Sequence, residues 1–228
     1  MKKFLLPLLS ALLAASFVPM AAAAPSRAEC VTHVLSCEAI LREFQANPEY
    51  VVPAAVLQRA RALVIVNQFK AGFFFGVKGG YGVVMVKKSD GRWSLPVLLS
   101  AGEASFGLQF GAKAVESVLV ITDEQTPKLL FNTRFNVGVD AKAVIGPKAA
   151  EAESNNQSIV STPVLVYTKS KGLFAGATIK AGFLSRDDKA NFALYDTQYT
   201  LPELLYSDWV KPIPEVTPLM DYVQKIAP

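Results

Sequence analysis

The amino-acid sequence predicts a single α+β domain with a curved, mainly antiparallel sheet or partial barrel, an N-terminal helix and short covering helices. Short apolar runs with a period of two follow one another closely between residues 62 and 122, separated by Gly, Ser and Asp. Apolar residues that recur every three or four positions, as in a helix, occur mainly toward the two ends of the chain. Because 51% of the residues are hydrophobic, the chain has enough apolar material for one well-buried core.

The first 23 residues have the pattern of a secretory signal peptide, which leaves residues 24–228 as the domain. Lys2 and Lys3 precede an apolar run over residues 4–18, and small residues follow. We therefore expect a periplasmic or secreted protein that can be peripheral to a membrane. Without Lys2 and Lys3 the net charge falls from +4 to +2, which gives little reason to expect a nucleic acid partner.

The spacing of apolar residues predicts a surface helix over residues 31–44. Of the two cysteines near the start of the domain, Cys30 directly precedes this range and Cys37 lies within it. On one unbroken helix their Cα atoms are about 10 Å apart, which is beyond disulfide reach. If the helix starts after Cys30, the two thiols can form a bridge in an oxidising compartment. His33 lies between them, but a metal site lacks its fourth ligand, so we expect no metal.

Beyond a short helix predicted over residues 53–60, the period of two predicts a series of strands. The first six are predicted at residues 62–67, 72–77, 82–88, 94–100, 105–110 and 115–122. Asp123 is a candidate N-cap for a helix that passes through residues 129–131. Residues 135–145 alternate most clearly between apolar and polar, and two further strands are predicted at residues 164–169 and 173–184.

Two helices are predicted in the last part of the chain. Asp187 is a candidate N-cap for a helix that ends at Leu194, and Thr217-Pro218 is typical of a helix start. The segment between these helices contains Pro202, Pro212 and Pro214, and we expect it to lie across the body of the domain.

A run of glycines and aromatic residues over positions 70–82 is echoed in shorter form at positions 171–176. Glycines four residues apart fall on one face of a strand, where another backbone, a ring or an acyl chain can approach closely. The glycines concerned are Gly72, Gly76, Gly79, Gly80, Gly82, Gly172 and Gly176. The lysines that bracket these glycines are Lys70, Lys78, Lys169 and Lys171. This pattern predicts a packing or binding surface.

The residue types needed for catalysis are sparse. His33 is the one histidine, so a histidine-dependent triad has to use the N-terminal helix. The residues around Ser105 have Glu103 where a nucleophile elbow has its first glycine. The glycine run matches neither phosphate-binding loop, since strand residues follow it. We therefore expect no enzymatic activity and no cofactor.

Several segments appear in an order that resembles the SYLF domain, and the resemblance covers nearly the whole chain after residue 24. They are EAILREF at 38–44, KAGF at 70–73, GGYG at 79–82, WSLP at 93–96, FGLQFG at 106–111, VIGP at 144–147 and SKGLFAG at 170–176. Asn191 and Tyr195 complete the series.

The resemblance implies lipid binding without enzymatic activity. Eukaryotic SYLF proteins bind phosphoinositide-containing membranes, and a yeast member also binds and bundles actin. Their lipid binding is linked to a basic amphipathic N-terminal helix, whereas the helix predicted here carries Arg42 against Glu38 and Glu43. An exported bacterial protein, as the short signal peptide indicates, also meets neither actin nor phosphoinositides.

The leading hypothesis from the sequence is a periplasmic protein that recognises anionic phospholipid at a membrane surface. The bracketing lysines motivate it, because lysine stems can lie on apolar surface while their ammonium groups reach phosphate. The alternative is a structural or protein-interaction module of the cell envelope, with an envelope protein as its partner. The family's actin binding and the proline-containing segment motivate this alternative.

Overall fold

The structure, a computed structural model, describes residues 24–71, 75–106, 113–147, 161–169 and 182–228. The predicted signal peptide therefore lies outside the described residues. In chain order the elements are α1 (Arg27–Ala46), α2 (Ala54–Leu57), β1 (Ala62–Ala71), β2 (Phe75–Val86), β3 (Val97–Phe106), β4 (Lys113–Ile121), α3 (Thr126–Leu129), β5 (Phe135–Asn136), β6 (Ala143–Ile145), β7 (Val164–Thr168), β8 (Phe183–Arg186), α6 (Asp188–Tyr195), α7 (Leu201–Tyr206) and α8 (Thr217–Ile226).

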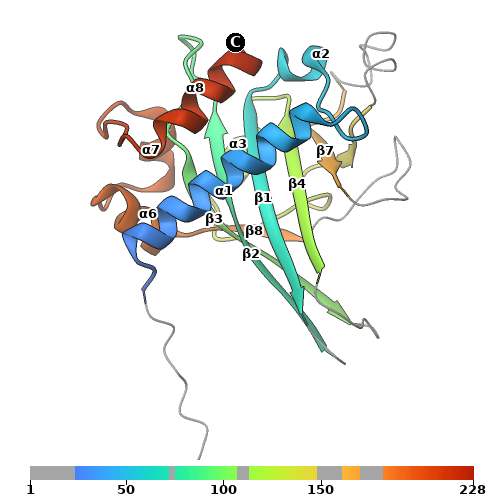
Figure 1. Cartoon of the computed structure of the whole chain (residues 1–228), viewed down its shortest axis with the longest axis horizontal. Helices are drawn as coiled ribbons and strands as arrows, with labels where there is room; N and C mark the ends of the chain where they lie inside the picture. Colours follow the sequence, from blue (N-terminus) through green and yellow to red (C-terminus); the bar gives the residue numbers. More distant parts are fainter. Residues whose placement is uncertain (1–23, 72–74, 107–112, 148–160, 170–181) are drawn as a thin grey trace, which may run out of the picture.

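Among the described residues, eight strands form one sheet in the order β5-β8-β3-β2-β1-β4-β7-β6. Neighbouring strands are antiparallel except β6 and β7, which are parallel. The sheet curls into a half-barrel, and α1 crosses one of its faces (Figure 1). The predicted α+β class with a curved, mainly antiparallel sheet is confirmed.

Helix α1 forms because its sequence supplies both an N-cap and an apolar stripe. The Ser26 side chain accepts a hydrogen bond from the Glu29 main-chain N–H and so satisfies one of the free donors at the helix start. Apolar side chains at intervals of three and four residues are buried against the sheet. They are Cys30, Val34, Cys37, Ile40, Leu41 and Phe44.

The start at Arg27 decides between the two alternatives for the cysteines. Cys30 and Cys37 lie on one unbroken helix, too far apart for a bridge, and both are buried free thiols. The possible disulfide between Cys30 and Cys37 is therefore not formed, and that alternative is wrong. Burial raises the pKa of the Cys37 thiol to about 12, so this thiol stays protonated at neutral pH.

The helix predicted after Asp187 is confirmed and is attached to the sheet by side chains. The Asp187 carboxylate accepts from the Ala190 N–H and caps α6. The buried Asn191 side chain accepts from the Leu98 N–H (2.8 Å) and donates to the Leu98 carbonyl (2.9 Å). One turn later, the Tyr195 hydroxyl donates to the Pro96 carbonyl. Asn191 thus gives β3 the hydrogen bonds that a neighbouring strand normally provides.

The last predicted helix is also confirmed, as α8. Pro218 stands in its first turn, where a missing N–H costs nothing. The Trp93 indole N–H donates to the Ala227 carbonyl at 2.8 Å and fixes the end of the helix against the sheet. Among the described residues, no helix is long and apolar enough to cross a membrane.

Two predicted strand breaks are wrong. The prediction ended one strand at Val77 and began the next at Gly82, but β2 runs without interruption through both positions. Likewise β3 continues from Val97 to Phe106, where two strands had been separated. Glycine was interpreted as a turn signal in both places, whereas here it lies within long paired strands.

The strand predicted over residues 135–145 is wrong as well. Its residues form the short strands β5 and β6 with a turn between them. Gly138 adopts a φ of +83°, and Val139 is 65% exposed. The Asp140 carboxylate accepts from the Asn136 main-chain N–H and closes the turn. The alternation of apolar and polar residues in this segment therefore did not correspond to one continuous strand.

Helix α7 was missed, because the prolines near it suggested an irregular tail. Thr200 and Glu203 form a capping box, in which the Glu203 carboxylate accepts from the Thr200 N–H at 2.6 Å. Pro202 occupies the first turn, where proline is tolerated. The T-x-x-E spacing in the sequence was the signal that identifies this helix.

Candidate functional site

Three lysines lie in one row at the end of the sheet where β1 ends and where β2 and β4 begin. Lys70 is directly opposite Lys78 in the β1–β2 pair and directly opposite Lys113 in the β1–β4 pair. Directly opposite residues share a face of the sheet and lie about 5 Å apart. We call Lys78, Lys70 and Lys113 the lysine row. In the next strand, β3, Glu103 is opposite Lys78.

At these register positions the sequence has three lysines and one glutamate, and like charges at directly opposite positions of a sheet are generally unfavourable. The strand ends that carry the lysine row extend past α1, at the lower right of Figure 1.

The same strand ends place aromatic positions on the opposite face. Phe75 is opposite Phe106 in the β2–β3 pair, and Phe69 immediately precedes Lys70 in β1. Successive residues of a strand alternate between faces, so these positions and the lysine row are on different sides of the sheet. The connecting segments 72–74 and 107–112 lie outside the described residues and contain no charged residue in the sequence.

Sequence reasoning found Lys70 and Lys78 but missed Lys113. The available signal for Lys113 was that a lysine flanks each of two uncharged segments. Lys70 precedes the uncharged segment Ala71–Val77, and Lys113 directly follows the uncharged segment 104–112. Of the other two lysines considered, Lys171 lies outside the described residues, and Lys169 is not part of the row.

Lys169 directly follows β7 and forms ion pairs with two glutamates. Its ammonium group is 2.5 Å from the Glu43 carboxylate of α1 and also contacts the Glu116 carboxylate of β4. Burial opposes the charge of Lys169, but hydrogen bonds to both glutamates outweigh it and raise its pKa. The same contact lowers the pKa of Glu43. Lys169 therefore ties α1 to the sheet.

We expect Lys169→Met to destabilise the protein by about 1–3 kcal/mol at pH 7, because two neighbouring carboxylates lose their counter-charge. The lowered pKa of Glu43 makes its contribution present above its unfolded pKa and absent after acidification. The difference in unfolding free energy between wild type and variant should therefore shrink from pH 7 to pH 3. Urea unfolding at both pH values measures it. An unchanged stability at pH 7 would contradict the structural role.

The glycines of the run have different surroundings. A Cβ atom on Gly80 would lie 2.2 Å from the Asn67 carbonyl oxygen, and one on Gly82 would lie 2.6 Å from the Ile65 carbonyl oxygen. These two glycines let β1 and β2 pack closely. Gly79 is exposed, and a Cβ atom there would meet no described atom within 4 Å. Gly76 is opposite Ser105 in the β2–β3 pair. Gly72, Gly172 and Gly176 lie outside the described residues.

Polar side chains separate the core under α1 from the strand ends. The Asn67 amide donates to the Tyr81 hydroxyl, which donates to the Ser36 hydroxyl of α1 at 2.9 Å. The His33 ring stacks on Tyr81 with ring centroids 3.7 Å apart, and burial lowers the pKa of His33. His33 therefore has a packing role. Sequence reasoning missed this cluster, because the strand break predicted at residues 78–81 excluded Tyr81 from the sheet.

Together these features define a single α+β domain whose half-barrel sheet has three lysines in register at one end. A family model described as "Ysc84: Las17-binding protein actin regulator" matches residues 102–226. The chain belongs to this family, which confirms the resemblance to the SYLF domain. No solved structure matches the chain.

The relatives in the comparison are eukaryotic. "SH3 domain-containing YSC84-like protein 1" of Homo sapiens is 28% identical over 76% of this chain and 52% of its own length. "LAS seventeen-binding protein 3" of Saccharomyces cerevisiae is 30% identical over 78% of this chain and 39% of its own length. The chain spans about half the length, or less, of the curated relatives it matches. The name of the yeast relative describes binding, and the family description names binding and actin regulation rather than a reaction.

Proposed function

We propose that this protein is a non-enzymatic lipid-binding module of the periplasm that docks on anionic phospholipid through its lysine row. The observation that carries the proposal is the register of Lys78, Lys70 and Lys113 across three adjacent strands. An anionic surface supplies the negative charge that relieves their mutual repulsion. The signal-like segment at residues 1–23 supports the compartment.

The position of the row at the sheet end supports a membrane surface as the anion. Phosphate groups of a bilayer form a plane, and three neighbouring strands that end together can contact such a plane side by side. Lysine in general can lay its stem on apolar surface while its ammonium group reaches phosphate, which suits this residue type to such a contact.

Vesicle co-sedimentation tests the proposal with wild-type protein and a variant in which all three row lysines are glutamine. Each lysine near an anionic surface contributes about 1 kcal/mol, so the triple variant should bind anionic vesicles about a hundredfold more weakly at low salt. Neutral vesicles should bind neither protein strongly. Rising salt should weaken wild-type binding.

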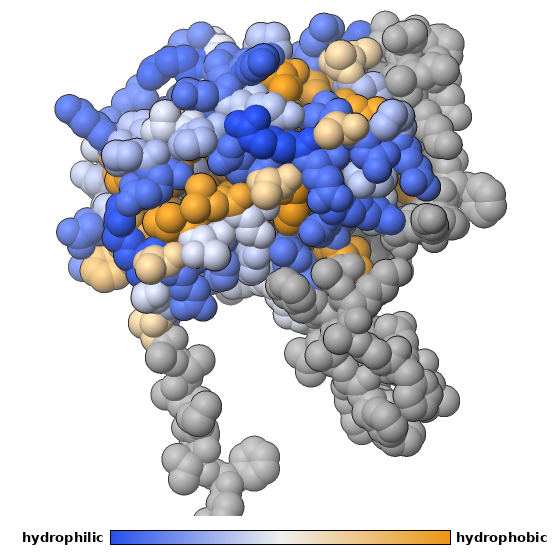
Figure 2. Space-filling model, in the orientation of Figure 1, coloured by the Kyte–Doolittle hydropathy of each residue, from blue (hydrophilic) through white to orange (hydrophobic). Residues whose placement is uncertain are grey.

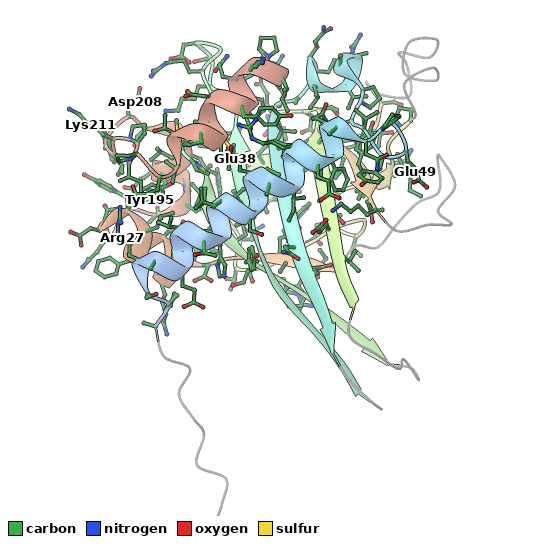
Figure 3. The ribbon with its side chains drawn as sticks, viewed as in Figure 1. Arg27, Glu38, Glu49, Tyr195, Asp208 and Lys211 are labelled. Atoms are coloured by element: carbon green, nitrogen blue, oxygen red, sulfur yellow. The ribbon has the colours of Figure 1, made fainter. Side chains whose placement is uncertain are left out.

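The matched control replaces three exposed lysines elsewhere, Lys189, Lys211 and Lys225, with glutamine. Lys211 lies on the other side of the molecule from the strand ends (Figure 3). The control has the same net charge as the triple row variant and should retain most of the binding. If both triple variants lose binding equally, net charge and not the row is responsible, and absence of wild-type binding at low salt rejects the proposal.

A second candidate function is a protein-interaction module of the cell envelope. The family description, which names a binding protein and actin regulator, favours it. Figure 2 shows apolar patches among charged residues on the face that carries α1. Trp209 is 65% exposed and its ring lies 5.3 Å from that of Tyr199, as in many interface hot spots. A stoichiometric protein partner that persists in detergent during a pull-down from envelope extract would favour this function.

A further inference from the structure

A small pocket lies at the opposite end of the sheet from the lysine row. Its volume is about 230 Å³, and it is lined by Gln58, Arg59, Arg61 and Thr122. Arg61 directly precedes β1, and Thr122 directly follows β4. Lys70 lies eight positions after the first residue of β1, so the pocket is about 26 Å from the row.

The walls of this pocket are fixed by main-chain hydrogen bonds. The Arg61 N–H donates to the Ile121 carbonyl at 2.7 Å, and the Arg61 carbonyl accepts from the Lys87 N–H. The Gln58 N–H donates to the Ala54 carbonyl and closes α2. Because the backbone on two sides is held in place, the side chains that line the pocket start from defined positions.

The two arginines of the pocket have little negative charge beside them. Within the part of the chain that the structure describes, the Arg59 side chain makes no hydrogen bond or ion pair. The Arg61 guanidinium has Glu124 at 4.0 Å, and both side chains are more than half exposed. Such exposed pairs contribute little, so an incoming anion can displace Glu124.

The charged residues next to this pocket leave its balance positive. An adjoining hollow of about 670 Å³ shares Arg61 with it and is also lined by Glu124. In that hollow, Lys88 pairs with Asp208 at 2.8 Å, and Lys87 donates to the Pro228 carbonyl. The other charged residues that line the hollow are Asp90 and Lys128.

We infer that the pocket lined by Arg59 and Arg61 binds a phosphate group. A guanidinium presents paired N–H donors that match two phosphate oxygens, and two arginines line this pocket together with Gln58. The Thr122 hydroxyl donates to the Thr162 carbonyl at 2.8 Å, so its oxygen can accept from a neighbouring hydroxyl of the ligand. A membrane that contacts the lysine row does not reach this pocket, which favours a soluble phosphate ester over a lipid headgroup.

An NMR titration tests this site with two probes, glycerol 3-phosphate and monomeric dihexanoylphosphatidylglycerol. We expect saturable shifts of the Arg59 and Arg61 side-chain N–H signals with glycerol 3-phosphate. Arg59→Gln and Arg61→Gln should each weaken binding about tenfold, since each removes a charge-assisted contact. Glu124→Gln should strengthen it severalfold, and Lys189→Gln, far from the pocket, should leave it unchanged.

The outcomes separate specific from diffuse binding. If neither probe gives saturable shifts, or if Lys189→Gln weakens binding as much as the arginine variants do, the site is rejected. Saturable binding of the lipid probe alone, lost in both arginine variants, retains the phosphate group as ligand and assigns it to a headgroup. Binding of vesicles by the lysine row does not enter this result, because both probes are used as monomers.

Discussion

Gly80→Ala should destabilise the protein by about 2–4 kcal/mol. A Cβ atom at this position would lie 2.2 Å from the Asn67 carbonyl oxygen and 2.7 Å from the Gln68 Cα atom. Both atoms belong to the backbone of the central strand β1, which pairs on both sides and has no room to retreat. Overpacking against backbone is among the few mechanisms that give effects of this size. Urea unfolding followed by circular dichroism measures it.

Gly79→Ala is the matched control, one residue away in the same strand. A Cβ atom there would meet no described atom within 4 Å, and the backbone is extended. We expect its unfolding free energy to stay within about 0.5 kcal/mol of wild type. Equal destabilisation of the two variants would mean that loss of glycine itself, and not contact with β1, is responsible.

Asn191→Leu should destabilise the protein by about 3–5 kcal/mol. Leucine has a similar size but makes no hydrogen bond, so the buried N–H and carbonyl of Leu98 both lose their partner. Each unpaired buried group costs about 1–3 kcal/mol. Thermal and urea unfolding measure the loss, and hydrogen exchange at Leu98 should accelerate relative to global unfolding if α6 detaches first.

The neighbouring Phe192→Ala provides the control for Asn191. Phe192 is on the same helix but 48% exposed, so its truncation should cost less than about 1 kcal/mol. A large effect of Phe192→Ala together with a small effect of Asn191→Leu would show that α6 is held by apolar contact rather than by the side-chain hydrogen bonds to β3.

Local signals in the sequence were sufficient where the determinant is local. Asp187 and Thr217-Pro218 identified two helix starts, because capping depends on residues within one turn. The glycines of β2 were misinterpreted, because their role depends on the partner strand, which local composition does not specify. The α+β class was predictable, because it depends on where along the chain apolar residues recur with the period of a strand and where with the period of a helix.

The candidate site was predictable only in part, because its geometry depends on strand register. Lys70 and Lys78 were selected as neighbours of glycine, while their direct opposition follows from the β1–β2 pairing. Lys113 joins them only because β4 pairs with β1, more than 40 residues earlier in the chain. The two glutamates around Lys169 come from α1 and β4, and no local pattern connects them.

The described outer strands of the sheet have a consequence for assembly. Strand β5 has two residues and strand β6 has three, so each outer edge presents few unpaired main-chain groups. Long free edges are the usual template for edge-to-edge aggregation, and short edge strands are one way in which proteins avoid it. Strands β5 and β6 therefore offer only a short template for polymerisation through the sheet, and a partner that binds at these two described edges has to recognise side chains instead of extending the sheet.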